Sequence, residues 1–337
     1  MRSMLAPEYG YLVKELQYLV GKRFSKIAKV ESGYKMKVGD ADLVCKPGIK
    51  LYITKYIEEA EDADAFVEKA RKELKGKILK GIGQINSDRI LMFDFGELKL
   101  YFEMFAKGNL VLVKNGKTVC ALRYEQWKDR AIKTNREYAP PRVPAEKLED
   151  VISGNYIIVS LLKLPLGRLY VEELLTRTKI DEKTPGNTLS EEQIKKLKET
   201  LAEMKKEFRP WVFYEDEKPA DFGLIKFSKY ARLEIRNFKT LSEAEDEFYF
   251  KQPVVEEKTH IEKLERRLEK QEEYLEQLKE DEKILKEKGD YIYANYEKIE
   301  KILETAGNSK LDEMEEKLSK YKAKLNKKEK SIEMEIQ

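Results

Sequence analysis

The sequence predicts an α+β protein, in which a head of antiparallel strands and short helices is followed by a charged coiled-coil arm. Short apolar stretches lie between turn signals in 24–53 and 78–122, which is typical of antiparallel meanders. Apolar residues then recur at helical spacing in 145–207 and at heptad spacing in 261–332. The length of 337 residues is sufficient for two or three folded units.

The first unit, residues 1–144, is expected to open with a helix. Apolar residues recur there at helical spacing up to Val20, and Gly21 ends the pattern. A meander of short strands follows over 24–53. A charged helix is then predicted over 58–74, because its apolar residues fall on one face.

A second meander over 78–122 completes the strands of the first unit. Its clearest signal is Asn115-Gly116 between alternating apolar residues, which is the strongest short pattern for a hairpin. The prolines of the segment 140–144 form a rigid, extended boundary at which the first unit is expected to end.

The second unit, residues 145–207, is predicted to be a small helical domain similar to a helix-hairpin-helix. A tight turn over 164–168 separates its helices, and Ser190 is placed to cap the last of them. The following segment, 208–252, is expected to be rich in strands and to return to the first unit. Its strands are predicted over 211–214 and 222–227, and a helix is predicted over 242–250.

The arm is assigned to residues 253–337. Its first heptad stretch has apolar residues at Ile261, Leu264, Leu268, Leu275, Leu278 and Leu285. Gly289-Asp290 is expected to break this stretch, and a more apolar helix is predicted over 291–303. The heptad then resumes at Leu311, Met314, Leu318, Tyr321, Leu325 and Ile332.

Two heptad stretches can pair within one chain or between two chains, so folding back and dimerisation both stay open. The second stretch stops without a capping residue near Gln337. We therefore expect the arm to continue into a further domain of a longer protein.

The composition of the chain limits the classes of function that it can have. Lys plus Arg number 66 and Asp plus Glu 63, so a net charge of +3 indicates no nucleic-acid partner by itself, and any basic patch is local. One histidine, His260, and two cysteines, Cys45 and Cys120, cannot build an ordinary zinc site or a Ser-His-Asp centre. No apolar run could span a membrane and no secretory leader is present. We expect a cytoplasmic protein that binds no membrane, metal or cofactor and has no catalytic residues.

Two acid–base pairs at predicted turns are candidate binding residues. Asp88 and Arg89 lie side by side between two strands, and Glu103 and Lys107 flank another turn that ends at Gly108-Asn109. A guanidinium held by a carboxylate can bind phosphate or stack on a base. The alternative is structural, since a turn aspartate commonly caps its own backbone and an arginine at a strand edge is commonly solvated.

Two further segments could contact a nucleic-acid backbone. The loop 127–136 contains Lys128, Arg130, Lys133 and Arg136 beside an aromatic residue, a pattern typical of phosphate contacts and equally of a solvated loop.

The turn 164–168, with Gly167 and Arg168, could offer backbone N–H groups to a phosphate, or it could be a simple turn between helices. No Walker A loop and no dinucleotide-binding glycine motif occurs.

The order of these patterns resembles the NFACT family, also called fibronectin-binding protein A-like, whose members are ribosome quality control factors. The resemblance covers the whole chain and rests on order and spacing rather than on any single motif. The passages that carry it are Pro7-Glu8-Tyr9 with Val13-Lys14-Glu15-Leu16, Asp88-Arg89-Ile90-Leu91, Phe102-Glu103-Met104-Phe105 with Gly108-Asn109-Leu110-Val111-Leu112, Arg130-Ala131-Ile132 with Tyr138-Ala139-Pro140-Pro141, Tyr170-Val171-Glu172-Glu173-Leu174, Phe238 with Leu241-Ser242-Glu243-Ala244 and Phe248-Tyr249, and Gly289-Asp290-Tyr291-Ile292 with Asn295 and Ile299.

The resemblance implies an NFACT-N domain similar to the N-terminal β-sandwich of formamidopyrimidine DNA glycosylases, then a helix-hairpin-helix domain and a coiled coil. A further RNA-binding NFACT-R domain would lie beyond Gln337. It also implies binding to the stalled large ribosomal subunit that carries peptidyl-tRNA. Members recruit tRNA, above all alanyl-tRNA, for untemplated C-terminal tailing of the nascent chain. A ubiquitin ligase or another degradation partner is expected to bind through the arm.

Four residues match family positions that the resemblance links to tRNA. Asp88 and Arg89 match the acid–arginine pair needed for tRNA recruitment. Glu8 stands where the family usually has aspartate, and Lys107 stands where bacterial relatives have arginine. The resemblance therefore favours the binding interpretation at Asp88 and Arg89.

Two alternatives come from the same features. The glycosylase likeness suggests a nucleic-acid-binding protein acting on DNA, but those enzymes begin with proline and glutamate, whereas this chain begins Met1-Arg2-Ser3 and has no zinc-finger cysteines. A purely structural coiled-coil scaffold is the second alternative, and it leaves the elaborate head unexplained.

Overall fold

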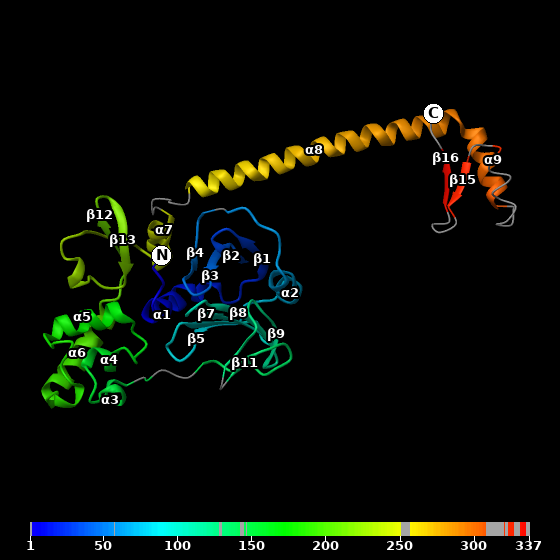
Figure 1. Ribbon diagram of the computed structural model, residues 1–337. Coiled ribbons are helices and arrows are strands. Elements are labelled where there is room, and N and C mark those ends of the chain that lie inside the picture. Colours follow the sequence, from blue (N-terminus) through cyan, green and yellow to red (C-terminus); the bar gives the residue numbers. More distant parts are fainter. Residues whose placement is uncertain are drawn as a thin grey trace. The chain divides into compact units, whose positions relative to one another are not determined.

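The protein forms two units, a head of residues Met1–Pro253 and an arm of residues Val254–Gln337, and each is described by itself (Figure 1). The head mixes antiparallel sheets with helices, as predicted. The computed structural model describes residues 2–56, 58–127, 130–141, 145, 147–250, 257–307, 320, 323–326 and 331–334.

The first sheet of the head is a four-stranded antiparallel meander. In chain and sheet order its strands are β1 (Phe24–Val30), β2 (Gly33–Val38), β3 (Ala41–Lys46) and β4 (Lys50–Ile53). In β2 the apolar residues Tyr34, Met36 and Val38 are buried and alternate with lysines, as the two-residue period of a strand requires. Helix α1 (Ala6–Glu15) precedes the sheet and continues as a 3-10 turn over Leu16–Leu19.

The second sheet has five antiparallel strands in sequential order. They are β5 (Gly81–Gln84), β6 (Ile90–Asp94), β7 (Leu98–Glu103), β8 (Asn109–Lys114) and β9 (Lys117–Ala121). The predicted hairpin is confirmed between β8 and β9, where Asn115 and Gly116 have φ of 49° and 82°. Asparagine and glycine tolerate this left-handed backbone better than other residues.

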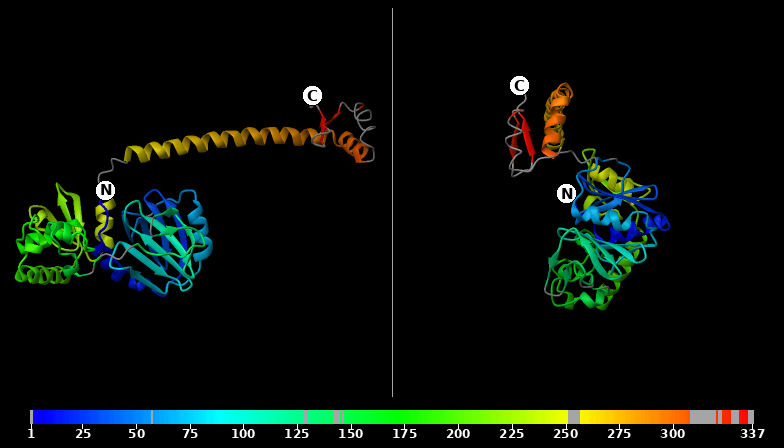
Figure 2. Two further views of the ribbon diagram at one scale, coloured as in Figure 1. Left: turned by 60° about the horizontal axis from the view of Figure 1, so that its bottom comes forward. Right: turned by 90° about the vertical axis from the view of Figure 1, so that its right-hand side faces the viewer.

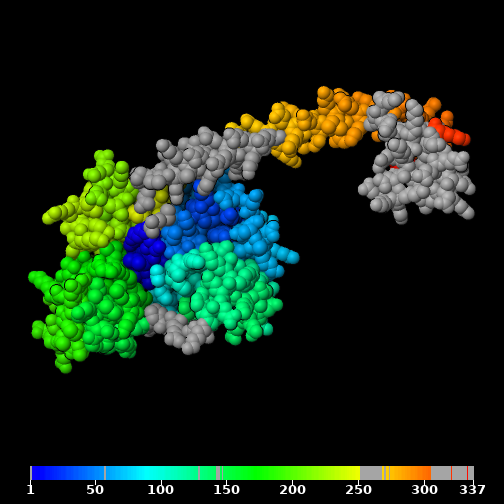
Figure 3. All heavy atoms as spheres, viewed as in Figure 1, coloured from blue at the N-terminus to red at the C-terminus, as the bar shows by residue number. Residues whose placement is uncertain are grey.

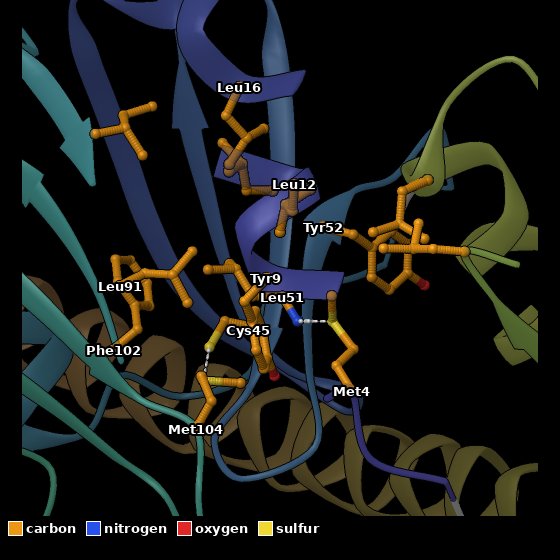
Figure 4. Packing of buried hydrophobic residues seen from close by; sticks show 14 of the residues in the cluster. Met4, Tyr9, Leu12, Leu16, Cys45, Leu51, Tyr52, Leu91, Phe102 and Met104 are labelled. Atoms are coloured by element: carbon orange, nitrogen blue, oxygen red, sulfur yellow. Dashed lines mark hydrogen bonds between the residues drawn. The ribbon is translucent and has the colours of Figure 1, made fainter. Parts of the chain in front are cut away.

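One hydrophobic core joins the inner faces of the two sheets. Phe24 of β1 meets Phe95, directly after β6, edge to face at 5.7 Å between ring centroids. Figure 4 shows the contact between Cys45 of β3 and Met104, whose sulfurs are 4.0 Å apart. Two sheets that share a core in this way form a sandwich.

The helix predicted over 58–74 is shorter than expected, because residues 58–64 are not helical. Helix α2 spans Ala65–Leu74, and Asp64 caps its start by accepting from the N–H of Val67 at 2.8 Å. Upstream, Glu58 instead binds the backbone N–H of Ser32 at 2.9 Å. These bonds to the β1–β2 turn and the cap outweigh the helix propensity of the charged segment.

The helical part of the head follows the prolines. Its helices are α3 (Leu148–Val151), α4 (Ile157–Leu161), α5 (Arg168–Thr178) and α6 (Glu191–Lys206). The predicted cap is confirmed, because Ser190 Oγ accepts from Gln193 N at 3.2 Å and Gln193 Oε1 accepts from Ser190 N at 2.9 Å.

The return segment forms a three-stranded sheet and a helix. Its elements are β12 (Trp211–Glu215), β13 (Lys218–Gly223), β14 (Glu234–Asn237) and α7 (Leu241–Phe250). The strand predicted over 222–227 is observed as β13, which starts four residues earlier, at Lys218. Asp216 and Glu217 adopt φ of 47° and 63° and make the tight hairpin turn that places it there. Strand β14 was missed.

Helix α7 is hydrogen-bonded to the first half of the head. Glu15 of α1 accepts from the N–H groups of Leu241 and Ser242 at 2.8 and 3.3 Å. Asp246 accepts from Thr54 Oγ1 at 2.7 Å and from Lys55 N at 3.0 Å, just after β4. Residues more than 190 positions apart are therefore joined by buried or half-buried bonds.

The arm differs from the predicted pair of heptad helices. Helix α8 (Glu257–Ala294) is continuous and passes through Gly289-Asp290, and α9 (Tyr296–Gly307) follows after Asn295 (Figure 2). Leu325 and Ile332 do not belong to a helix. They pair with each other in an antiparallel hairpin of β15 (Ala323–Asn326) and β16 (Ser331–Met334). The other predicted heptad positions of the second stretch, Leu311, Met314, Leu318 and Tyr321, lie outside the described residues.

Candidate nucleic-acid interface

Three turns of the head meet at one end of its sheets, and we call them the loop cluster: residues 46–49, 85–89 and 104–108. Strands β5 and β7 run in the same direction, so the turns that follow them lie at the same end of the sheet. Arg89 O accepts from Met104 N at 2.7 Å, which joins the second and third turns. The first turn packs closely against the third, since a Cβ at Gly48 would lie 2.5 Å from Ala106 O.

The β5–β6 turn holds the predicted pair Asp88 and Arg89. Asn86 and Ser87 have φ of 53° and 54°, so the chain reverses sharply before the pair. Asp88 Oδ1 accepts from the backbone N–H of Arg89 at 2.7 Å. Gln84 Nε2 donates to Asp88 O and to Ala6 O, both at 2.8 Å, which anchors the turn to α1. Asp88 therefore fixes the backbone of Arg89 and not its guanidinium, contrary to the prediction.

The cations of the loop cluster are available to a ligand. Among the described residues no carboxylate pairs with the half-buried Arg89 or with the exposed Lys107. Arg123 adds a third positive charge and donates to the carbonyls of Lys107 and Gly108. Unpaired guanidinium and ammonium groups on adjacent turns are well suited to phosphate oxygens.

Glu8, the third predicted tRNA contact, is not at the surface. Its side chain is fully buried and forms a bidentate pair with Arg2, at 2.6 Å between Nη2 and Oε1 and 3.2 Å between Nη1 and Oε2. Burial raises the pKa of Glu8, and the charge and hydrogen bonds of Arg2 oppose that shift. A direct contact between this carboxylate and RNA is incompatible with its burial. The structure assigns Glu8 to the packing of the N-terminal segment.

Sequence reasoning missed the partners of Glu8. Arg2 Nε also pairs with Asp221 Oδ1 at 2.5 Å, and its guanidinium carbon lies 3.8 Å from the ring centre of Phe222. Tyr170 donates to Glu8 Oε1 at 3.2 Å and accepts from the N–H of Leu224 at 3.1 Å. The blue N-terminal residues lie between the green helical part and the strands (Figure 3). No sequence pattern connects residues so far apart, so only the fold reveals this network.

Arg130, expected to contact a nucleic-acid backbone, is already paired. It donates to both oxygens of Glu103, at 2.8 and 3.0 Å, and Tyr138 donates to Glu103 at 2.9 Å. Both side chains of the Arg130–Glu103 pair are more than nine-tenths buried. The structure therefore does not favour the predicted contact of Arg130 with a nucleic-acid backbone, because this guanidinium is buried in its pair with Glu103.

Two further cations of the basic loop, Lys133 and Arg136, are exposed. Lys133 donates to Gln126 Oε1 at 2.7 Å across the short β10–β11 pair (Glu125–Gln126 and Ala131–Ile132). Arg136 is exposed, and its backbone accepts from Thr118 N at 2.8 Å. Lys128 lies outside the described residues. Lys133 and Arg136 remain geometrically suited to backbone contacts.

Gly167 and Arg168 begin helix α5. Gly167 has φ of 80°, and a Cβ there would lie 2.8 Å from Leu5 Cδ2, so glycine is required both by conformation and by close packing. Arg168 is 70% exposed and pairs with Glu172 one turn along the helix at 2.6 Å. The predicted phosphate contact of this turn stays a prediction.

The described part of the chain holds no group of three or more side chains suited to a metal ion. Cys45 and Cys120 are buried free thiols. Burial raises the pKa of both, that of Cys120 to about 12, so neither is a reactive thiolate at neutral pH. Within the described residues we find no helix long and apolar enough to cross a membrane.

Comparison with known proteins gives a family match over most of the chain. Residues 11–337 match the family described as NFACT N-terminal and middle domains. The archaeal Rqc2 homolog aRqcH of Methanocaldococcus jannaschii is 33% identical over 87% of this chain and 50% of its own length. The ribosome quality control complex subunit NEMF of Mus musculus is 24% identical over 85% of this chain and 32% of its own length. The chain thus spans half or less of these curated relatives.

Two solved structures are similar in fold to about three quarters of the chain. The fibrinogen binding protein from Staphylococcus aureus aligns with a TM-score of 0.57 at 22% identity, over 73% of this chain and 98% of that one. The N-terminal part of the fibronectin/fibrinogen-binding protein from Streptococcus suis aligns with a TM-score of 0.56 at 19% identity, over 74% of this chain and all of that one. At these identities the likeness concerns the fold alone.

Proposed function

This chain belongs to the NFACT family, and from that membership we propose that it is a ribosome quality control adaptor that recruits tRNA. The curated relatives that support the proposal are named as Rqc2 homologues and as subunits of ribosome quality control complexes. In this proposal the protein binds the stalled large ribosomal subunit with its peptidyl-tRNA. It then recruits tRNA, alanyl-tRNA in particular, for untemplated tailing of the nascent chain.

The observation that carries the proposal is the pair of unpaired cations on adjoining turns. Arg89 and Lys107 have no carboxylate partner among the described residues, and their turns are joined through Met104. The left-handed turn and the Gln84 anchor fix the backbone from which Arg89 extends. A fixed backbone reduces the conformational freedom that this residue loses when it binds a phosphate or a base edge.

The proposed role needs no catalytic group in this chain. Peptidyl transfer is left to the ribosome, and the adaptor contributes position, which alone can account for large rate effects. The loop cluster holds the tRNA, and the arm extends toward another part of the subunit or toward a degradation partner such as a ubiquitin ligase. The exposed Lys133 and Arg136 would add sequence-independent phosphate contacts.

Replacing the pair, Asp88→Ala with Arg89→Ala, tests this proposal. We expect tRNA that co-purifies with the wild-type protein to be lost, because the variant removes the guanidinium and the side chain that fixes its backbone. The melting temperature should shift by only a few degrees, since the turn lies at the surface and contributes little to the core.

The matched control removes one acid and one base elsewhere. Lys195 and Glu199 form an exposed pair on α6, so Lys195→Ala with Glu199→Ala should retain the tRNA. Retention of tRNA by the Asp88–Arg89 variant, or collapse of its fold, would assign the pair a structural role and refute the proposal.

A further inference from the structure

The three-stranded sheet of the return segment has one edge without a partner strand. Its strand order is β13–β12–β14, so β14 pairs with β12 on one side, and among the described residues no strand pairs with its other side. Helix α7 packs on β12 and β13 (Figure 1). An unpaired strand edge can accept an additional strand from another chain.

The backbone groups that face this open edge follow from the pairing of β14 with β12. Phe238 N donates to Pro210 O at 3.0 Å. Bonds between antiparallel strands fall on every second residue, so the residues two and four positions before Phe238 bond to β12 as well. The N–H and C=O groups of Ile235 and Asn237 therefore point away from β12, where the described part of the chain supplies no partner for them. The open edge thus presents donors and acceptors in the alternation that a neighbouring strand requires.

A cavity of about 370 Å³ lies against the same edge, and we call it the edge pocket. Its apolar lining consists of Phe213, Phe227, Tyr230, Leu233 and Ile235. The rings of Phe213 and Tyr230 are in contact, at 4.7 Å between centroids. Leu233 and Ile235 are two positions apart and half-buried, so they lie on the same face. A strand added beside β14 would direct every second side chain toward this cavity.

The acid and the base that line the edge pocket are already bonded. Glu173 of α5 accepts from Ser228 N and from Arg177 Nε, both at 2.7 Å. Arg177 also donates to both oxygens of Glu207 at 2.9 Å. These bonds hold α5 against the 3-10 turn Ser228–Tyr230. The interior of the edge pocket is therefore suited to an apolar side chain and not to a charged one.

The rim of the edge pocket is positively charged. Lys226, Lys229 and Arg232 are exposed, and none of them pairs with a carboxylate among the residues that the structure describes. Lys226 lines the pocket, and the other two lie in the segment 228–235 that forms one of its walls. The adjacent acid, Glu234, is paired with Arg236 at 2.8 Å. An acidic partner would therefore meet complementary charge at this edge.

We propose that β14 and the edge pocket bind an acidic, extended peptide segment of another protein, which adds to the sheet as a fourth strand. The segment pairs with the free backbone groups of Ile235 and Asn237. Its residue opposite Ile235 is a large apolar one and enters the pocket, because opposite residues of paired strands share a face. Carboxylates on either side of that residue meet the rim cations. The inference uses no residue of the loop cluster and is independent of the proposed RNA-binding function.

RNA is a second candidate for a positively charged edge, and the backbone of β14 argues against it. Phosphate oxygens would attract the rim cations and accept from the free N–H groups. They cannot donate to the free C=O groups of Ile235 and Asn237, whereas a peptide strand satisfies donors and acceptors alike. An apolar pocket beside the edge also suits a peptide side chain.

A second copy of this chain is the third candidate, since two β14 strands could pair with each other. That arrangement would bring the rim cations Lys226, Lys229 and Arg232 of both copies to one interface. Like charges that face each other disfavour an interface. An acidic partner avoids this repulsion.

A synthetic peptide tests the inference. The probe is fluorescein-labelled Asp-Asp-Val-Phe-Val-Asp-Asp, and fluorescence anisotropy measures its binding to the full chain. We expect saturable binding of this peptide and none of the charge-reversed Lys-Lys-Val-Phe-Val-Lys-Lys.

Backbone methylation of the probe tests the strand pairing itself. N-methylation of the phenylalanine and of the residues two positions on either side removes the N–H groups that would face β14. We expect this change to weaken binding about tenfold or more, because hydrogen bonds to the open edge are lost. The matched control is N-methylation of the two valines, whose N–H groups point away from β14. This control peptide should bind like the unmodified probe.

Reversing the charge of the rim tests the preference for acids. Lys226→Glu with Arg232→Glu should weaken binding of the acidic peptide and allow the lysine peptide to bind. Lys26→Glu with Lys37→Glu makes the same change of net charge at exposed positions of β1 and β2. This matched control should leave both affinities unchanged.

Ile235→Pro tests the edge from the side of the protein. Proline removes the free N–H of residue 235 and breaks no bond to β12, so it should weaken binding of the acidic peptide about tenfold. Circular dichroism melting shows whether this variant folds. The exposed charge reversal keeps the inference testable if it does not.

Four outcomes would overturn the inference. The first is the absence of saturable binding of the acidic peptide to the full chain. The second is equal weakening by the two patterns of N-methylation, or by neither. The third is saturable binding of oligouridylate at the rim cations without binding of the peptide, which would assign this edge to RNA. The fourth is a dimer in sedimentation velocity that Ile235→Pro abolishes while no peptide binds, which would assign the edge to a second copy.

Discussion

At the scale of single residues, the N-terminal segment is held by charge inside the head. Arg2 connects Glu8 of α1 with Asp221 of β13, and Tyr170 of α5 completes the network. Removing one partner of such a buried pair typically costs about 3–5 kcal/mol, because the other charge remains uncompensated. The residue that matched an RNA-binding position of the family therefore acts here by fixing three parts of the head to one another.

Glu245 of α7 is a second buried acid, and it predicts a pH dependence of stability. Among the described residues, neither of its carboxylate oxygens has a hydrogen-bond partner, and its side chain is fully buried. Burial raises the pKa of Glu245 well above 4.5, and the nearby Glu8 and Glu15 raise it further against the opposing charges of Arg2 and Lys50. Burial therefore favours the neutral form of this carboxyl in the folded protein.

The direction in which stability changes with pH follows from the raised pKa of Glu245. Below about pH 4.5 the carboxyl is protonated in both states, so its contribution to stability is fully present. As the pH rises further, the Glu245 carboxyl ionises in the unfolded state and stays neutral in the folded state. The stability of the fold therefore falls until the pH reaches the raised pKa of Glu245. Glu245→Gln should therefore raise the melting temperature relative to wild type at pH 8 and change it little at pH 4.

Thermal melts at several pH values check this prediction. Glu203→Gln on the exposed face of α6 is the matched control and should leave the pH profile unchanged. Equal effects of Glu245→Gln at pH 4 and pH 8 would mean that the buried carboxyl is charged in the folded state.

At the scale of the elements, two glycines allow the loop cluster to close. Gly108 and Gly116 both have positive φ, but they differ in their surroundings. A Cβ at Gly108 would lie 2.1 Å from Gly48 N, whereas nothing lies within 4 Å of one at Gly116. Gly108→Ala should force the β3–β4 and β7–β8 turns apart.

We expect Gly108→Ala to lose tRNA binding and also to lower stability, since backbone conformational strain and a backbone clash act together. Gly116→Ala carries only the strain, at roughly 1–2 kcal/mol, and should keep tRNA binding. Urea denaturation and tRNA co-purification measure the two effects separately. Normal tRNA binding by a folded Gly108→Ala variant would show that the convergence of the turns is irrelevant to the site.

Sequence patterns predicted the elements whose signals are local. Asn115-Gly116 and Ser190 fixed a hairpin and a helix start, because each acts through its own backbone and its immediate neighbours. Predictions failed where a distant partner decides the outcome. The segment 58–64 binds a neighbouring hairpin instead of forming a helix, and Leu325 pairs in a strand instead of a heptad.

The candidate site followed the same rule. The positions of Asp88, Arg89 and Lys107 agree with the predicted turns, since turn chemistry is visible in the sequence. The burial of Glu8 and the pairing of Arg130 with Glu103 could not be foreseen, because both depend on packing between residues far apart or on facing surfaces. Apparent surface charges in a sequence are therefore weak evidence of a binding role until their partners are known.

At the scale of the whole molecule, the head and the arm offer different surfaces. In the head the charged network is inside and the loop cluster is outside. In the arm, Leu268, Leu275 and Leu285 of α8 are each more than half exposed, so this described part of the apolar heptad seam is open to solvent. Pairing of this seam as a coiled coil remains a prediction, and the proposal of RNA binding rests on the loop cluster of the head.

Sequencing the RNA that co-purifies with the protein from its own cells tests the central claim most directly. The account predicts enrichment of tRNA, together with ribosomal RNA of the large subunit, for the wild-type protein. It also predicts that the variant with both Asp88 and Arg89 replaced by alanine retains the ribosomal RNA and loses the tRNA. Recovery of no specific RNA, or an identical RNA profile for wild type and variant, would contradict the account.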